Sequence, residues 1–218
     1  MRLSHYQTLV FDCDGVVLDS NRSKTAAFYQ AALPYGEDAA NRLANFHINH
    51  GGISRYKKFA LFLAEMVDTV EGPNLDELLE SYASHVKESL MACQVADGLE
   101  ALRRSTPKAR WLIVSGGDQT ELREVFAARD LASHFDGGIF GSPDTKDEIL
   151  ARELGIGNIT PPAIFLGDST YDHQASTAAG LDFIFVSGWT EVPGWRDWCK
   201  RNDLGVVNDL KALLTSAS

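Results

Sequence analysis

The chain has 218 residues, of which 44% are hydrophobic and 23% are charged, as expected for a folded protein with one sizeable core and a small second domain. Its formal net charge of -10 argues against nucleic acid or an anionic membrane surface as a partner. No apolar run approaches the ~18 residues of a membrane-spanning helix, and the N-terminus lacks a basic-then-apolar signal pattern. We therefore expect a cytoplasmic protein.

The first predicted element is a short buried strand over residues 9–11, which ends at Asp12. Asp12 and Asp14 are two residues apart, so on an extended chain both side chains leave the same face, and Gly15 lets the backbone bend directly afterwards. Carboxylates held this close raise each other's pKa unless a cation lies between them or one of them holds a proton. We interpret the pair as part of a metal site; the alternative is that both acids cap a turn.

The segment from residue 21 to residue 93 has helical patterns and no convincing strand. A first short helix is predicted over residues 24–33, and a second is capped by Ser54 and covers one broad apolar face. A third begins at Asn74, with Glu77 in the capping-box position. Three or four helices in this segment predict a small, lid-like bundle.

After Cys93 the pattern changes to alternating strands and helices. Predicted strands cover residues 111–114, 139–140, 163–166, 183–186 and 206–207, and predicted helices cover residues 97–104, 118–128, 145–154, 173–179 and 210–214. Connections this short imply right-handed crossovers and a parallel sheet. We predict an α/β protein whose doubly wound, Rossmann-like core is formed by residues 1–19 and 93–218, with an inserted helical cap over residues 20–92.

Polar residues follow the predicted strands, at the edge of the sheet where ligands bind in such folds. Ser115 and Gly116 follow the second strand and precede a helix that Asp118 caps, which leaves a hydroxyl and backbone N–H groups suited to a phosphate. Taken alone, this Ser-Gly-Gly segment could equally be an ordinary loop.

Two further segments carry charge near strand ends. Lys146 occupies the first turn of a helix capped by Thr145, where the helix dipole disfavours a cation unless an anion lies opposite. Asp168 and Asp172 follow the strand over residues 163–166. The alternatives are a solvated surface lysine and a turn with a helix cap, although a cap explains only one of the two acids.

Together, the strings FDCDGVVLDS, IVSGGD, the isolated Lys146 and FLGDSTYD resemble, in order, the four motifs of the haloacid dehalogenase-like superfamily. The resemblance implies that Asp12 is a nucleophile that attacks phosphorus and that Asp14 is the acid/base. It also assigns Ser115 with its loop amides, Gly116 included, and Lys146 to the phosphoryl oxygens. The lysine segment departs from the usual K-P-x-P form.

The resemblance further implies a Mg²⁺ site formed by Asp12, the backbone carbonyl of Asp14 and Asp168. Hard divalent cations prefer such oxygen ligands. Asp172 would either bind the metal through water or orient Lys146.

A helical cap directly after the first motif resembles the β-phosphoglucomutase and phosphoglycolate phosphatase branch. The segment Gly-Ile-Ser-Arg over residues 52–55 is similar to the cap segment that faces substrate in β-phosphoglucomutase. Lys24 and Arg55 are therefore predicted to bind substrate, with exposed helix positions as the alternative. His47 and His50 are expected near a loop, as ordinary polar contacts.

These features predict a Mg²⁺-dependent phosphatase for a small phosphorylated metabolite, such as a sugar phosphate or sugar acid phosphate, acting through an aspartyl phosphate. The alternative is a β-phosphoglucomutase-like phosphomutase, which the Gly-Ile-Ser-Arg segment favours. A non-catalytic binding protein would be expected to have lost Asp12, Asp14 or Asp168, and all three are present. The partner is expected to be the substrate alone, and the protein a monomer or small homo-oligomer.

Overall fold

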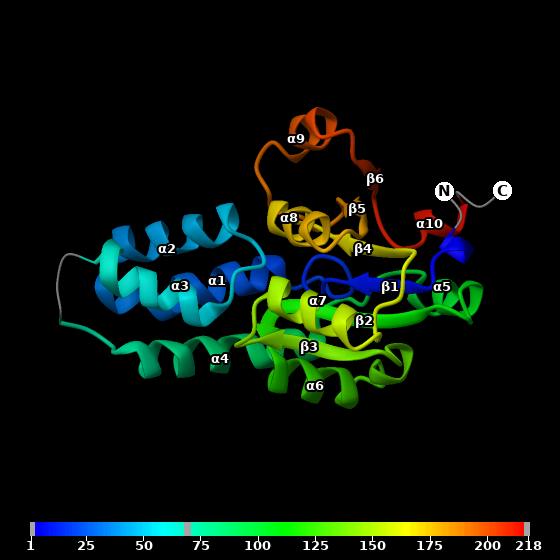
Figure 1. Ribbon diagram of the computed structural model, residues 1–218. Coiled ribbons are helices and arrows are strands. Elements are labelled where there is room, and N and C mark those ends of the chain that lie inside the picture. The colour runs from blue at the N-terminus through cyan, green and yellow to red at the C-terminus, as the bar shows by residue number, and fades with distance from the viewer. Residues whose placement is uncertain (1–2, 68–70, 216–218) are drawn as a thin grey trace.

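A six-stranded parallel sheet forms the centre of the protein in the computed structural model, which describes residues 3–67 and 71–215 (Figure 1). Its strand order is β3-β2-β1-β4-β5-β6, so the first strand lies in the middle of the sheet. The strands are β1 (Thr8–Phe11), β2 (Arg110–Asp118), β3 (Gly138–Ser142), β4 (Ala163–Gly167), β5 (Asp182–Val186) and β6 (Gly205–Val207). The predicted α/β class and parallel sheet are confirmed.

Helices cover both faces of this sheet, because successive side chains of a buried strand point to opposite faces. Val10 pairs in register with Leu112 and Phe165, and all three belong to the hydrophobic cluster beneath α7 and α8. Phe11 belongs to the opposite cluster, with α5 and α6. The core helices are α5 (Leu99–Ser105), α6 (Gln119–Ala128), α7 (Lys146–Gly155), α8 (Thr170–Ala178), α9 (Trp195–Arg201) and α10 (Ala212–Thr215). Of these, α9 was not predicted.

Four helices between β1 and β2 form a bundle beside the carboxyl ends of the strands (Figure 1). They are α1 (Asn21–Ala32), α2 (Glu37–Asn49), α3 (Arg55–Leu61) and α4 (Leu75–Ala92), with a turn of 3-10 helix at Leu33–Tyr35 and of π-helix at Phe62–Met66. The predicted Ser54 cap and the Asn74–Glu77 capping box are both present. None of the helices in the described ranges is long and apolar enough to cross a bilayer.

Helix α2 was not predicted. Its buried face consists largely of alanines, and the residues just before it, Pro34 and Gly36, are typical of a loop. Gly36, whose φ is +94°, does end the preceding 3-10 turn. A new helix then begins, and Glu37 and Asp38 stabilise its first turn through the helix dipole. His47 lies in the last turn of this helix, near the loop that follows it.

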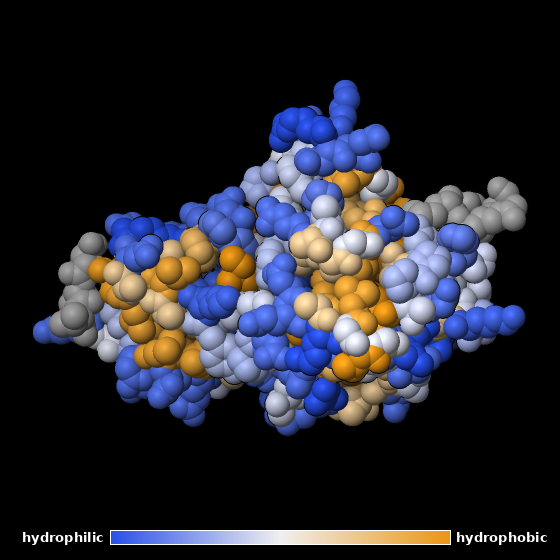
Figure 2. Space-filling view, in the orientation of Figure 1, coloured by the Kyte–Doolittle hydropathy of each residue, from blue (hydrophilic) through white to orange (hydrophobic). Residues whose placement is uncertain are grey.

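The face of the molecule drawn in Figure 2 has hydrophobic residues over the bundle and over the sheet, with mostly hydrophilic residues between them. This polar zone lies where the bundle meets the core. The buried residues after β1, β2 and β4 lie together on one side of the sheet, because parallel strands end at one edge of it.

Candidate active site

A pocket lies between the core and the bundle and contains about 640 Å³ of empty space, including the solvent at its mouth. Its charged and polar side chains come from the core residues Asp12, Asp14, Asp168, Ser169 and Glu191 and from the bundle residues Asn21, Lys24, His47, Arg55, Lys58 and Tyr82.

Asp12 follows β1 directly and is buried beneath the pocket. One carboxylate oxygen accepts the N–H of Cys13 at 2.7 Å, and the other lies 2.9 Å from the ammonium of Lys146. Burial raises the pKa of Asp12 to about 7, against the opposing attraction of Lys146. These two contacts hold the Asp12 side chain in one orientation, and the ammonium of Lys146 lies beside one of its carboxylate oxygens.

Lys146 is buried between two acids, Asp12 and Asp172, and is not a solvated surface lysine. The two acids hold the pKa of Lys146 above its usual value although burial acts to lower it. The predicted Thr145–Glu148 capping box is present, so Lys146 does occupy the first turn of α7. The unfavourable helix dipole at that position is offset by the two carboxylates opposite.

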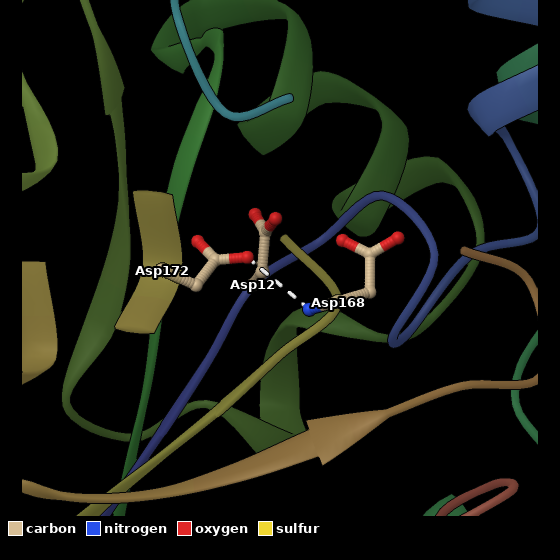
Figure 3. A group of neighbouring side chains, drawn as sticks. All are labelled: Asp12, Asp168 and Asp172. Atoms are coloured by element: carbon tan, nitrogen blue, oxygen red, sulfur yellow. Dashed lines mark hydrogen bonds between the residues drawn. The ribbon is translucent and has the colours of Figure 1, made fainter. Parts of the chain in front are cut away.

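Both carboxylate oxygens of Asp172 contact other residues of the site: one faces Lys146 and the other accepts from Asp168 and Ser169. Its second oxygen accepts the N–H groups of Asp168 and Ser169 and the hydroxyl of Ser169, and Figure 3 shows the first of these bonds. Of the two roles considered for Asp172, these contacts favour orientation of Lys146 and of the loop after β4.

Asp168 lies across from Asp12 at the end of β4, and Figure 3 shows both side chains extending from neighbouring strands. Carboxylate oxygens of Asp12, Asp168 and Asp172 lie within 4.8 Å of one another. Burial, followed by repulsion from Asp12 and Asp172, raises the pKa of Asp168 well above its usual value. Such a cluster suits a hard cation with oxygen ligands.

Gly15 makes the approach of Asp168 sterically possible. Its φ is +76°, and a Cβ atom there would lie 2.1 Å from a carboxylate oxygen of Asp168 and 2.4 Å from the amide nitrogen of Asn21. The amide of Asn21 in turn donates to Asp168 at 2.7 Å. The glycine of the D-x-D-G string is therefore required for close contact as well as for the bend.

Asp14 is bound by Lys24 and Ser20, each at 2.6 Å. Burial acts to raise the pKa of Asp14, but these two partners hold it below its usual value. Lys24, predicted to bind substrate, lines the pocket with its ammonium committed to Asp14. The ammonium of Lys24 thus compensates the negative charge of Asp14, the predicted acid/base.

Ser115 and Gly116 lie where β2 becomes irregular, with a register shift between Val114 and Asp118. The Ser115 hydroxyl is fully buried and accepts the N–H of Gly117 at 3.0 Å. A Cβ atom on Gly116 would lie 2.2 Å from the carbonyl oxygen of Gly52. Gly52, at the start of the bundle segment over residues 52–55, is therefore in direct contact with Gly116 of the predicted phosphate loop.

Arg55, also predicted to bind substrate, forms a 2.7 Å ion pair with Glu121 of α6. Its neighbour Tyr56 donates to Asp118, the cap of the same helix, at 2.7 Å. Both bonds join the bundle to the core. The sequence carried no signal for this bridge.

Sequence reasoning also missed Asn21, Lys58 and a role for His47 in the pocket wall. The signal for Lys58 was its place beside Phe59 and four residues before Phe62, on the apolar face of its helix. A lysine at such a position is buried unless its side chain can reach water.

The comparisons with known proteins agree with this geometry. A family model described as haloacid dehalogenase-like hydrolase matches residues 9–186. The chain belongs to this family. No curated protein matches the chain. The match covers every candidate residue and makes the protein an enzyme of the hydrolase class.

Solved structures of this family have the same fold. A predicted phosphatase from Clostridium acetobutylicum has a TM-score of 0.72 and 19% identity, covering 97% of both chains. A predicted phosphoglycolate phosphatase from Haemophilus somnus has a TM-score of 0.71 and 16% identity, covering 99% of this chain and 100% of the other. A candidate β-phosphoglucomutase from Thermotoga maritima has a TM-score of 0.66 and 18% identity, covering 96% and 97%.

Proposed function

We propose that the protein is a Mg²⁺-dependent phosphatase that hydrolyses a small phosphorylated metabolite through an aspartyl phosphate on Asp12. The observation that carries the proposal is the buried contact of Lys146 with Asp12, which lines the pocket together with Asp168. A carboxylate nucleophile needs a defined orientation and nearby positive charge for the oxygens of the attacked phosphoryl group, and these contacts supply both.

In the proposed reaction an oxygen of Asp12 bonds to phosphorus while the bond to the leaving oxygen breaks, and Asp14 donates a proton to that oxygen. Asp14 then accepts a proton from the water that hydrolyses the aspartyl phosphate, which frees phosphate and restores Asp12. The contact with Lys24 favours the ionised form of Asp14 and so favours the second step. Lys146 and the Ser115–Gly116 segment would stabilise the phosphoryl oxygens.

Asp12, Asp168 and the backbone carbonyl of Asp14 are the residues that would hold Mg²⁺, with residues 20–92 acting as a cap over the pocket. The donors fit the ion, because they are oxygens and because burial, followed by repulsion from Asp12 and Asp172, raises the pKa of Asp168, and a cation would offset both effects. When bound, the ion would neutralise part of the charge that the acids and the phosphate bring together.

Mg²⁺ is expected to raise the melting temperature (Tm) of the protein, because binding to the folded state alone stabilises it. At about 100 times the dissociation constant the gain is ~2.7 kcal/mol, or roughly 5–11 °C for a chain of this size. Differential scanning fluorimetry with increasing Mg²⁺ measures the shift. Asp168→Asn should lose most of it, whereas Asp76→Asn, which removes an exposed acid from α4, should keep it. An undiminished shift in Asp168→Asn would contradict the proposed ligand set.

The direct test of the phosphatase is a screen of phosphorylated metabolites, including sugar phosphates and sugar acid phosphates, scored by phosphate release. We expect release from one substrate or a few related ones with Mg²⁺, and none after chelation with EDTA. Absence of release across the whole screen with Mg²⁺ present would count against the proposed activity.

A phosphomutase is the second candidate, favoured by the close contact of Gly52 with Gly116. A cap segment seated on the phosphate loop would exclude water, so the phosphoryl group on Asp12 would return to a bound sugar phosphate. Free phosphate and isomerised product, measured in the same reaction, separate the two functions.

A further inference from the structure

Three cations of the bundle line the pocket: Lys24, Arg55 and Lys58. All three are buried, with exposed fractions of 5%, 7% and 1%. Lys24 is paired with Asp14 and Arg55 with Glu121, so the charges of these two are already compensated within the protein. The third differs.

Lys58 has no carboxylate partner. Its ammonium lies 2.7 Å from Nδ1 of His47 and 5.4 Å above the ring of Phe28, and within residues 3–67 and 71–215 no carboxylate oxygen lies in ion-pair distance of it. Burial, followed by repulsion from Lys24, lowers the pKa of Lys58 from 10.5 to about 7. Buried lysines are rare unless they are paired, so this position is unfavourable for the free protein.

His47 orients the ammonium and adds no positive charge. Its ring packs on Phe28 with 4.6 Å between centroids, and burial together with Lys58 and Lys24 lowers the pKa of His47 well below its usual value. Because the ammonium of Lys58 can only donate, Nδ1 of the neutral ring accepts and the ring proton is on Nε2. One ammonium hydrogen is thus used, and two remain.

We propose that Lys58, held by His47, binds a carboxylate of the substrate, so that the substrate is a phosphate ester that also carries a carboxylate. The inference rests on the proposed function and narrows its substrate class from phosphorylated metabolites to phosphorylated acids. Burial lowers the pKa of Lys58, and a bound anion would favour its charged form; that single positive charge matches a carboxylate better than a second phosphate, which carries close to two negative charges. The sequence predicted that Arg55 binds the second anionic group of the substrate; here that role belongs to Lys58, one helical turn further along α3.

Non-hydrolysable ligand pairs test the inference without turnover. Phosphonoacetate, 3-phosphonopropionate and 4-phosphonobutyrate are each compared with the alkylphosphonate of equal carbon number, by calorimetry with Mg²⁺ present. In the wild-type protein we expect the carboxylate to improve affinity by about tenfold or more at the best chain length. In Lys58→Met the improvement should fall below about twofold, with alkylphosphonate affinity unchanged.

Lys87→Met is the matched control, because it removes an exposed cation from the same bundle and should behave as wild type. The Tm of the metal-free protein should rise in Lys58→Met, because an apolar side chain replaces a buried ammonium without a carboxylate partner. A fall in Tm would show that Lys58 stabilises the fold, and would overturn the inference.

The outcomes separate the two proposals. Equal affinity for the paired ligands at every length, with clear alkylphosphonate binding, overturns the carboxylate site and leaves the phosphatase standing. Failure of every phosphonate to bind counts against both. A carboxylate preference that depends on Lys58, in a protein that releases no phosphate from any ester, supports the site and counts against the phosphatase.

Discussion

Asp12→Asn is expected to abolish phosphate release, by a factor of roughly 10³ or more, while the protein stays folded. The amide has almost the same shape and its oxygen can still accept from Lys146, although its NH2 group cannot accept the N–H of Cys13. It cannot form the acyl phosphate, because a neutral amide is a poor nucleophile. Initial rates with the best substrate of the screen, with Mg²⁺ present, measure the loss.

The stability of the same variant provides an independent check. The folded-state pKa of Asp12, about 7, is above its usual 3.8, so folding penalises the ionised form. This cost is absent below the unfolded pKa and grows as the pH rises towards 7. At about pH 8 and without metal, Asp12→Asn should therefore have a Tm equal to or above that of wild type.

Asp130→Asn is the control for both measurements, because Asp130 is exposed and far from the pocket, and its positive φ suits asparagine. It should keep full activity. Substantial turnover by purified Asp12→Asn would show that another residue is the nucleophile.

Lys146→Met is expected to lose both activity and stability. Removing one partner of a buried ion pair leaves uncompensated charge, which costs about 3–5 kcal/mol, or roughly 6–20 °C in Tm. Here the Lys146 side chain is fully buried, and the substitution leaves both Asp12 and Asp172 without their cation. Urea unfolding at neutral pH without metal measures the change, and Lys108→Met, at an exposed position, should change little.

A second substitution distinguishes lost charge pairing from lost packing. Adding Asp172→Asn to Lys146→Met should recover roughly 0.5–3 kcal/mol of the lost stability, because one of the two unpaired acids is neutralised. Activity should not return, since no cation faces the phosphoryl oxygens. If Lys146→Met were as stable as wild type, the proposed role of Lys146 as the buried counter-ion of both acids would be wrong.

The local elements of this protein could be predicted because their signals are local. The apolar run of β1, the caps formed by Ser54, Asn74 and Thr145, and the alternation of strands and helices after Cys93 each depend on neighbouring residues. Four motifs in a fixed order at strand ends then indicated the family and the convergence of Asp12, Lys146 and Asp168. Helix α2 was missed because Pro34 and Gly36, just before it, are typical of a loop.

The partner of each buried charge depended on the tertiary structure. Lys24 and Arg55 were predicted to face substrate, but Asp14 and Glu121 lie beside them once the bundle packs on the core. Lys58 lies on the apolar face of its helix, and among the described residues its ammonium meets the rings of His47 and Phe28 and no carboxylate. Pairing between charges depends on distances across elements that are far apart in the chain, and on burial that strengthens those interactions, and neither quantity is present in the order of the residues.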